Sequence, residues 1–161
     1  MKPPENVVRD MTEEDIDEVV EIDLYNQLPK ASVKRYTKYI RCRDKFWASV
    51  LSDGNVINAY CIYRIKSPQI YIYRMAAHPD FGEIIALSYF LGIVKKAADE
   101  SVDTRVVIHA NERDLELQLF LKEQKFLATA LLRGASEDGE DVYQFEYGVD
   151  LLCEFAVGNH K

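Results

Sequence analysis

Apolar and polar residues follow two different periods along the chain, and the change of period separates predicted helices from predicted strands. Apolar residues that recur every three or four positions predict helices, whereas alternating apolar residues between turn residues predict strands. The pattern predicts helices over 12–26, 32–44, 82–100 and 112–125. It predicts strands over 6–11, 46–51, 56–65, 69–77, 104–110, 126–133 and 142–147.

The segment 12–26 carries the start signal of a helix in its first residues. Thr12 stands at the N-cap and Asp15 at the third helical position, a variant of the capping box in which each side chain binds the other's backbone N–H. We expect the apolar face of this helix to pack against a sheet. The residues that recur at helical spacing on that face are Ile16, Val19, Val20 and Leu24.

The order of the predicted elements, β-α-α-β-β-β-α-β-α-β-β, determines the fold class. Three consecutive strands between residues 46 and 77 form an antiparallel meander, and the helix over 82–100 crosses over to a parallel strand at 104–110. A hairpin closes the chain. The order therefore predicts an α/β fold with a central mixed, mostly antiparallel sheet of about seven strands and helices on both faces.

The length and composition fit one globular domain. The chain has 161 residues, of which 48% are hydrophobic and 29% are charged. We expect a single domain over 1–161, with a core at 6–148 and an apolar tail at 149–161. No apolar run is long enough to span a bilayer, and the first residues lack the apolar stretch of a signal peptide, so we expect a cytoplasmic protein with no membrane partner.

The net charge of −7 at pH 7 bears on the class of partner. It argues against a nucleic-acid partner, which needs a basic face, and it is compatible with a cationic or amine partner. Cys42, Cys61 and Cys153 lie far apart and lack the spacing of a metal site or of a disulfide framework. We therefore expect no metal, and we expect each cysteine to act as a small buried hydrophobe.

Three stretches of the sequence, taken in order, carry a resemblance to a known family over roughly residues 6–148. Residues 46–63, FWASVLSDGNVINAYCIY, resemble its second and third strands, and residues 71–100 resemble its fourth strand and cofactor helix. Residues 111–147 resemble its C-terminal helix and hairpin, including an LRG…GED pattern ahead of an aromatic strand. The family is the GNAT superfamily of acetyl-CoA-dependent N-acetyltransferases, and the last stretch is typical of the ribosomal-protein-alanine N-acetyltransferase branch.

The resemblance implies acetyl-CoA as the acetyl donor and assigns it a place. In the family, the fourth strand bulges and parts from the fifth, which makes room for the pantetheine arm; here the bulge is expected near residues 75–77. The diphosphate is held by N–H groups at the start of the next helix, in the pattern Q/R-x-x-G-x-G/A. The implied acetyl-CoA site is Met75, Ala76, Ala77, Gly82, Glu83, Ile84, Ile85 and Ala86.

The sequence departs from that phosphate pattern. Phe81 replaces the Gln/Arg, Ile84 replaces the first glycine, and Glu83 brings a negative charge to an anion site. Without the resemblance, the two alanines at the strand end would equally suit packing beneath a helix.

The implied reaction is attack of a free amine on a thioester, which needs a base, donors for the oxyanion and an acid for the thiolate. The family's tyrosine acid falls here on Phe120 or Leu121, neither of which donates a proton. The catalytic candidates are His109 as base and Tyr73 as phenol, and the alternatives are a solvated histidine and a core tyrosine. Structural roles are expected for His78 in a turn, for Asn111 and Glu112 as helix caps, and for Phe46 and Trp47 in the core.

The expected function is N-acetyl transfer from acetyl-CoA to a primary amine, on a small molecule or a peptide N-terminus, by direct attack in a ternary complex. The alternative is a catalytically impaired GNAT-like domain that serves as a CoA-binding or protein-interaction module. The altered phosphate pattern and the absent tyrosine favour this alternative. A third hypothesis is a dimerisation domain, in which Leu151, Leu152 and Phe155 contact a second copy and make a homodimer.

Overall fold

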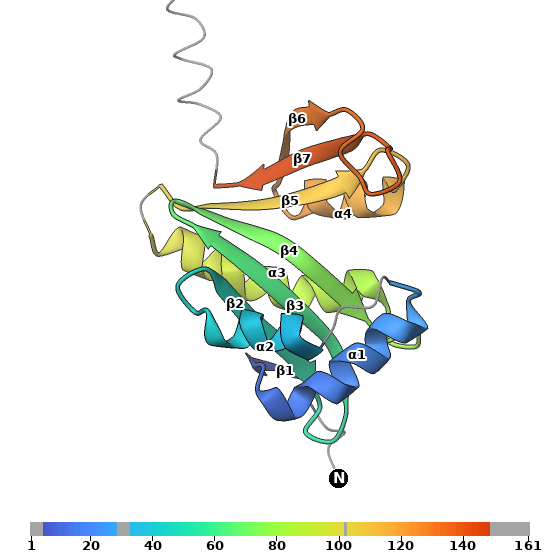
Figure 1. The fold of residues 1–161 in the computed structure, drawn as a ribbon. Helices are drawn as coiled ribbons and strands as arrows, with labels where there is room; N and C mark the ends of the chain where they lie inside the picture. The colour runs from blue at the N-terminus through green and yellow to red at the C-terminus, as the bar shows by residue number, and fades with distance from the viewer. Residues whose placement is uncertain (1–4, 29–32, 102, 149–161) are drawn as a thin grey trace, which may run out of the picture.

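A seven-stranded twisted sheet forms the middle of the molecule (Figure 1). The structure is a computed structural model and describes residues 5–28, 33–101 and 103–148. The strands are β1 (Val7–Asp10), β2 (Phe46–Ser52), β3 (Ile57–Lys66), β4 (Gln69–Ala77), β5 (Arg105–Asn111), β6 (Leu127–Leu132) and β7 (Val142–Tyr147). The helices are a 3₁₀ turn η1 (Glu13–Asp15), α1 (Ile16–Tyr25), α2 (Val33–Arg41), α3 (Glu83–Asp99) and α4 (Leu115–Glu123).

The strands lie in the order β1-β2-β3-β4-β5-β7-β6. Only β4 and β5 are parallel among the paired strands of the described residues, and α3 is the crossover that joins them. The mixed, mostly antiparallel sheet and the order of the elements along the chain are therefore confirmed.

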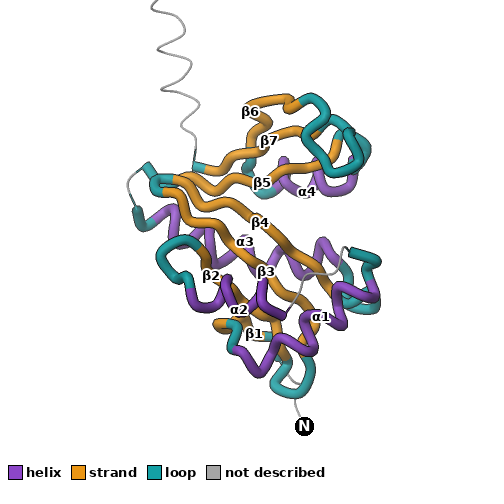
Figure 2. Tube along the Cα trace, in the orientation of Figure 1, coloured by secondary structure: helices purple, strands orange, loops and turns teal. Residues whose placement is uncertain are grey.

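The helices cover both faces of the sheet, and each face has its own apolar core. On one face, Phe90 of α3 and Leu121 of α4 are fully buried in one cluster of apolar side chains. On the other face, Val19 of α1 and Tyr36 of α2 are fully buried in a second cluster. Figure 2 shows α1 and α2 together on one side of the sheet. Each fully buried side chain contributes roughly 2 kcal/mol to folding, so these two cores hold the layers together.

The start of the first helix is built as the sequence predicts. The backbone N–H of Thr12 donates to Asp15 Oδ2 at 2.8 Å, which is one half of the capping box. The prediction that Leu24 belongs to the buried apolar face is wrong, because Leu24 is 57% exposed. Asp23 is buried beside it, because its carboxylate accepts hydrogen bonds from two buried tyrosines.

The start of α4 differs from the prediction. Asp114 is the N-cap, and its carboxylate accepts a hydrogen bond from Leu117 N at 3.1 Å. Asn111 belongs instead to β5, where it pairs with Val142. The prediction that Asn111 and Glu112 cap the helix is therefore wrong, because pairing with β7 extends the strand through Asn111.

The remaining expectations concern membranes, metals and cysteines. Within the described residues, no helix is both long and apolar enough to cross a membrane, and no cluster of His, Cys, Asp or Glu side chains is arranged to hold a metal ion. Cys61 is buried as expected, whereas Cys42 is only half-buried. Cys153 and the apolar side chains of the tail lie outside the described residues.

Candidate active site

The parallel pair of strands separates part of the way along its length. β4 and β5 pair from Gln69 opposite Arg105 to Tyr71 opposite Val107. Beyond this point β4 continues to Ala77 without pairing to β5. The separation leaves backbone N–H and C=O groups on the facing edges that a ligand can bind.

A β-bulge in β4 lies at the same point. The pairing with β3 places partners opposite Ile72 and Arg74, and it leaves Tyr73 with no opposite residue. Residues 75–77 pair regularly with β3, so the expected position of the bulge near these residues is wrong. A bulge bends its strand and increases the local twist, which accounts for the separation of the two strands beginning here.

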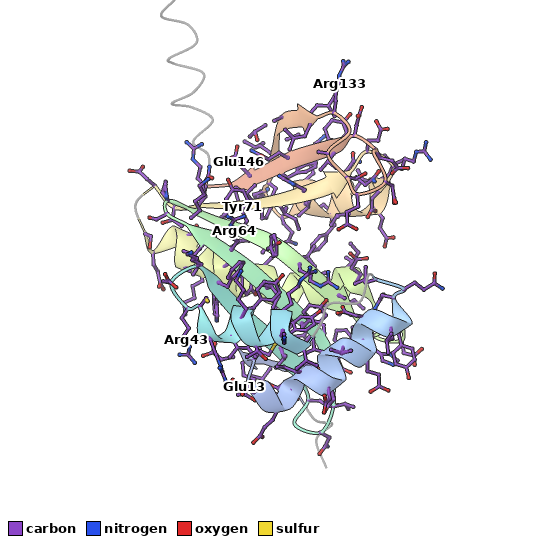
Figure 3. The ribbon with its side chains drawn as sticks, in the orientation of Figure 1. Glu13, Arg43, Arg64, Tyr71, Arg133 and Glu146 are labelled. Carbon is purple, nitrogen blue, oxygen red and sulfur yellow. The ribbon has the colours of Figure 1, made fainter. Side chains whose placement is uncertain are left out.

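A cavity of about 520 Å³ opens where the strands part. It is lined by Arg64 and Lys66 of β3, by Tyr71, Ile72 and Tyr73 of β4, and by Val107 and His109 of β5. Figure 3 labels Arg64 and Tyr71 close to the region where β4 and β5 run together. The two catalytic candidates, His109 and Tyr73, therefore line the same cavity.

His109 is oriented by a neighbour on β7. Its Nε2 lies 3.3 Å from Oε1 of Gln144, and the imidazole is exposed to the cavity side of the sheet. With Oε1 as the acceptor, Nε2 carries the proton and Nδ1 keeps a lone pair, which is the tautomer that a base at Nδ1 requires. A histidine in this tautomer can accept a proton from a bound amine.

Tyr73 joins this cavity to a second one. Its side chain is half-exposed, and its ring packs edge-on against Tyr39, with centroids 6.0 Å apart, and against Phe46 at 5.8 Å. Burial, together with the nearby Tyr73, raises the pKa of Tyr39. The second cavity, of about 540 Å³, is lined by Tyr73, Tyr39, Phe46, Lys34, Arg35, Lys38 and Glu137. Phe46, expected in the core, is thus half-buried and forms part of this wall.

A buried polar network lies beneath this wall, and the sequence analysis missed it. The carboxylate of Asp23 accepts hydrogen bonds from the hydroxyls of Tyr36 and Tyr60, and the Arg74 guanidinium lies 3.2 Å from it. Burial raises the pKa of Tyr36 to about 12 and that of Tyr60 far above its ordinary value, so both hydroxyls stay protonated and donate. One signal was available, since Asp23 stands four residues after Val19 on an otherwise apolar face.

The start of α3 offers hydrogen-bond donors next to open space. Gly82 is the N-cap with φ of +99°, a conformation that favours glycine, and a Cβ there would meet only Ile85 Cδ1, at 3.8 Å. The N–H groups of Glu83, Ile84 and Ile85 form the first turn and have no partner within the helix. Such a helix start can bind an anion.

Carboxylates surround this helix start. The Glu83 side chain is exposed, yet desolvation by nearby protein atoms, together with the carboxylates of Asp114 and Glu116, raises its pKa. Asp114 and Glu116 belong to the start of α4. The corner therefore combines donors from the backbone with negative charge from the side chains.

The predicted acetyl-CoA residues fall into two groups. Met75 is half-buried, and Ala76 and Ala77 are buried at the end of β4, which leads through residues 78–81 into α3. In the first turn of α3, Ile85 is exposed and Ala86 is fully buried. The N–H of Ala86 donates to Gly82 O at 3.1 Å, which leaves the donors of residues 83–85 for a ligand.

The position of the family's tyrosine acid provides no proton donor. Leu121 is fully buried in the core, and Phe120 packs half-buried against it. Tyr73, on β4, is the phenol that lines the cavity instead. His78 lies in a turn after β4, as expected, because its carbonyl accepts a hydrogen bond from Phe81 N at 2.9 Å. Trp47, which was expected in the core, is only half-buried, and its indole donates to Asp10 at 2.9 Å.

An apolar groove of about 480 Å³ lies between α4 and the β6–β7 hairpin. Leu115 and Leu119 of α4 face it, and Lys122 is its one ionisable side chain apart from Tyr143. It holds neither catalytic candidate, so we place the candidate site at the parting of β4 and β5.

The fold is shared with solved acetyltransferases. A probable acetyltransferase from Staphylococcus epidermidis superposes with a TM-score of 0.75 at 14% identity, over 89% of this chain and 98% of that one. The ribosomal-protein-S18-alanine N-acetyltransferase from Escherichia coli gives 0.73 at 12% identity, over 88% and 92%. NAA60 from Arabidopsis thaliana, solved in complex with acetyl-CoA, gives 0.72 at 12% identity, over 89% and 98%.

These likenesses confirm the predicted GNAT-like fold. No model of a protein family matches the sequence, and no curated protein sequence matches it either.

Proposed function

We propose that the protein transfers an acetyl group from acetyl-CoA to a primary amine. The observation that carries this proposal is the parting of β4 from β5 beyond Tyr71, at a bulge, in a fold shared with solved N-acetyltransferases. His109 and Tyr73 line the cavity at this point and supply a base and a phenol.

The described residues fit an extended thioester donor. The pantetheine arm would lie along the separated edges of β4 and β5 and pair with their free backbone groups, as an added strand does. The diphosphate would meet the N–H groups of Glu83, Ile84 and Ile85, and the open space beside Gly82 lets its oxygens approach. The acetyl-CoA complex of NAA60, which has this fold, supports this class of donor.

The negative charges at the start of α3 oppose this binding. A carboxylate such as Glu83 facing a diphosphate costs roughly 1 kcal/mol when the pair is partly solvated. Because the pKa of Glu83 is already raised, part of this cost is relieved when the side chain takes up a proton on binding. We infer that acetyl-CoA binds, with an affinity that these carboxylates reduce.

The reaction would proceed by direct attack. The amine nitrogen forms a bond to the thioester carbonyl carbon, and the carbon–sulfur bond breaks. Nδ1 of His109 takes the proton that the amine loses, and the Tyr73 hydroxyl gives a proton to the departing thiolate. Tyr73 regains its proton from solvent, because the residue is about half exposed.

A melting experiment with acetyl-CoA tests the proposal. A ligand at about 100 times its Kd adds about 2.7 kcal/mol of stability, which for a chain of this size raises the Tm by about 5 °C or more. An unchanged Tm at millimolar acetyl-CoA would contradict the proposal. The Tm is also measured with CoA, which lacks the acetyl group. The difference between the two ligands separates binding of the pantetheine arm from recognition of the thioester.

The second candidate function is a CoA-binding or protein-interaction module without catalysis. The three carboxylates around the start of α3 and the absence of a tyrosine at residues 120 and 121 favour it. In that case acetyl-CoA and CoA would raise the Tm equally, and no acceptor amine would become acetylated.

A further inference from the structure

The linings of the two cavities at the candidate site are basic, although the chain as a whole is acidic. Arg64 and Lys66 of β3 line the first cavity, and none of the described residues adds a carboxylate to it. Lys34, Arg35 and Lys38 of α2 line the second cavity, where Glu137 contributes the one carboxylate among the described lining residues. The whole chain has 20 Lys and Arg against 27 Asp and Glu, so this concentration of positive charge is local.

These cations are also free of ion pairs within the described part of the chain. None of the five has a carboxylate within 4.0 Å, whereas Arg9 and Arg41, elsewhere on the surface, lie 2.7 and 2.8 Å from theirs. All five side chains are exposed. An exposed, unpaired cluster of this kind repels cations and attracts anions.

The two cavities share one lining residue. Tyr73 lines both of them, and its ring packs against Tyr39 and Phe46 in the wall of the second. An acceptor that places its amine near His109 can therefore extend past Tyr73 toward α2. Along this path it meets Arg64 and Lys66 first, and then the cations of α2.

We propose that the acceptor is a free amine carried on an acidic chain, that is, a peptide N-terminus followed closely by Asp or Glu residues. This inference rests on the proposed acetyl transfer and names its substrate class. It reverses the expectation, drawn from the net charge of −7, of a cationic partner, because the local charge at the site has the opposite sign. The same overall charge argues for a peptide over a nucleic acid, which would be repelled by the rest of the surface.

The positive surface also serves the chemistry. Nearby cations disfavour a charged ammonium and lower the pKa of a bound amine, which increases the fraction present as the neutral nucleophile. Acidic residues that follow the amine pair with these cations, and this attraction offsets the repulsion between the cations and the peptide's N-terminal ammonium. The cations of the site thus attract acidic peptides, and those not neutralised by the peptide favour the neutral form of its amine.

The test uses three peptides with free N-termini that differ only in their second to fourth residues, which are Glu, Gln or Lys. Each is assayed for kcat/KM with acetyl-CoA and, without acetyl-CoA, for binding by fluorescence anisotropy. Two or three exposed ion pairs correspond to about a tenfold preference for Glu over Gln, with Lys below both. Raising the salt concentration should reduce this preference, because these ion pairs are exposed.

Two double variants link the preference to the proposed surface. Arg64→Glu with Lys66→Glu should abolish or invert the preference, whereas Lys96→Glu with Arg133→Glu, the same charge change on exposed positions elsewhere, should retain it. Figure 3 shows Arg133 at the outer edge of the molecule, pointing away from it. All four side chains are exposed, and an unchanged Tm in each variant confirms that it folds.

The outcomes separate this inference from the proposed function. Equal rates and equal binding for the three peptides overturn the acidic acceptor and leave acetyl transfer standing. Binding of the Glu peptide without any turnover supports the acidic partner and contradicts acetyl transfer. If the Arg64/Lys66 variant loses affinity for acetyl-CoA itself, or if single-stranded RNA binds more tightly than the Glu peptide, the acidic acceptor is overturned.

Discussion

The guanidinium of Arg74 lies 3.2 Å from the carboxylate of Asp23, and this ion pair joins β4 to α1. Tyr36 of α2 and Tyr60 of β3 donate to the same carboxylate, so a single buried acid holds four elements together. Arg74 follows directly after Tyr73 at the bulge. The network therefore fixes the backbone on which the candidate phenol is mounted.

Replacing Asp23 by Ala should lower the free energy of unfolding by about 3 kcal/mol, because it leaves the Arg74 charge and two buried hydroxyls without their partner. Urea denaturation measures this loss. Asp17→Ala, at an exposed position of the same helix, is the matched control and should change stability by less than about 0.5 kcal/mol. Equal effects of the two substitutions would show that the network contributes little.

Replacing Glu83 by Gln should tighten acetyl-CoA binding by roughly fivefold, because it removes the negative charge nearest to the donors of α3. The wild-type affinity should rise as the pH falls through the raised pKa of Glu83, since protonation neutralises the same carboxylate. Isothermal titration calorimetry at two pH values measures both effects. The control is Glu100→Gln, just beyond the other end of α3, which should leave the affinity for acetyl-CoA unchanged. If Glu83→Gln also leaves the affinity unaltered, the Glu83 side chain lies outside the site.

Replacing His109 by Gln should lower kcat/KM by about 100-fold, because the substitute cannot take the proton of the amine. The acid limb of the pH profile of kcat/KM should also flatten. Gln144→Ala, which removes the group that holds Nε2, should give a smaller loss and keep the limb. A His109→Gln enzyme with the wild-type pH profile would show that another group acts as base.

Replacing Tyr73 by Phe should lower kcat by about 10-fold to 100-fold and leave the acceptor KM nearly unchanged. The hydroxyl that protonates the thiolate is lost, whereas the ring that packs against Tyr39 and Phe46 remains. Steady-state kinetics separates the two constants. Tyr89→Phe, on an exposed position of α3, is the control, and an unchanged kcat in Tyr73→Phe would assign the proton to water.

Asp15 should make stability depend on acid pH. Burial raises the pKa of this carboxyl, but its bonds to Arg9, at 2.7 and 2.9 Å, and to Thr12 N lower it further, so the net pKa lies below the ordinary value. The stabilisation is present above the ordinary pKa of an aspartate and disappears as the pH falls through the lowered one. Asp15→Asn should therefore cost about 1 kcal/mol at neutral pH and almost nothing near pH 2.

Urea denaturation at the two pH values measures the Asp15 effect. Asp44→Asn, at an exposed position after α2, should show no such dependence. A constant difference between Asp15→Asn and the wild type at both pH values would mean that the charge of Asp15 does not contribute.

Local patterns along the sequence were sufficient to predict the elements and their order. The β4 prediction matches at both ends, because a polar turn before Gln69 and a proline after Ala77 bound an alternating run. The predicted start of α4 was too early because strand pairing, which depends on the distant Val142, keeps Asn111 in β5. The apolar periodicity of one segment does not show which residues of a distant strand pair with it.

The site was harder to predict for the same reason. His109 and Tyr73 were identified from their places on two strands, and the structure places both in one cavity. The bulge position follows from the register between β3 and β4, which a single sequence does not define. The basic surface was hidden because α2 and β3 bring together cations about thirty positions apart, while the overall composition is acidic.

The central claim is that the parting of β4 and β5 is a site of acetyl transfer. The most direct measurement is mass spectrometry of a peptide with a free N-terminus after incubation with the protein and acetyl-CoA. The account predicts an acetylated N-terminus with wild-type protein and a rate at least about 100-fold lower with the His109→Gln, Tyr73→Phe double variant. An unmodified peptide under conditions in which acetyl-CoA stabilises the protein, or equal rates for wild type and double variant, would contradict it.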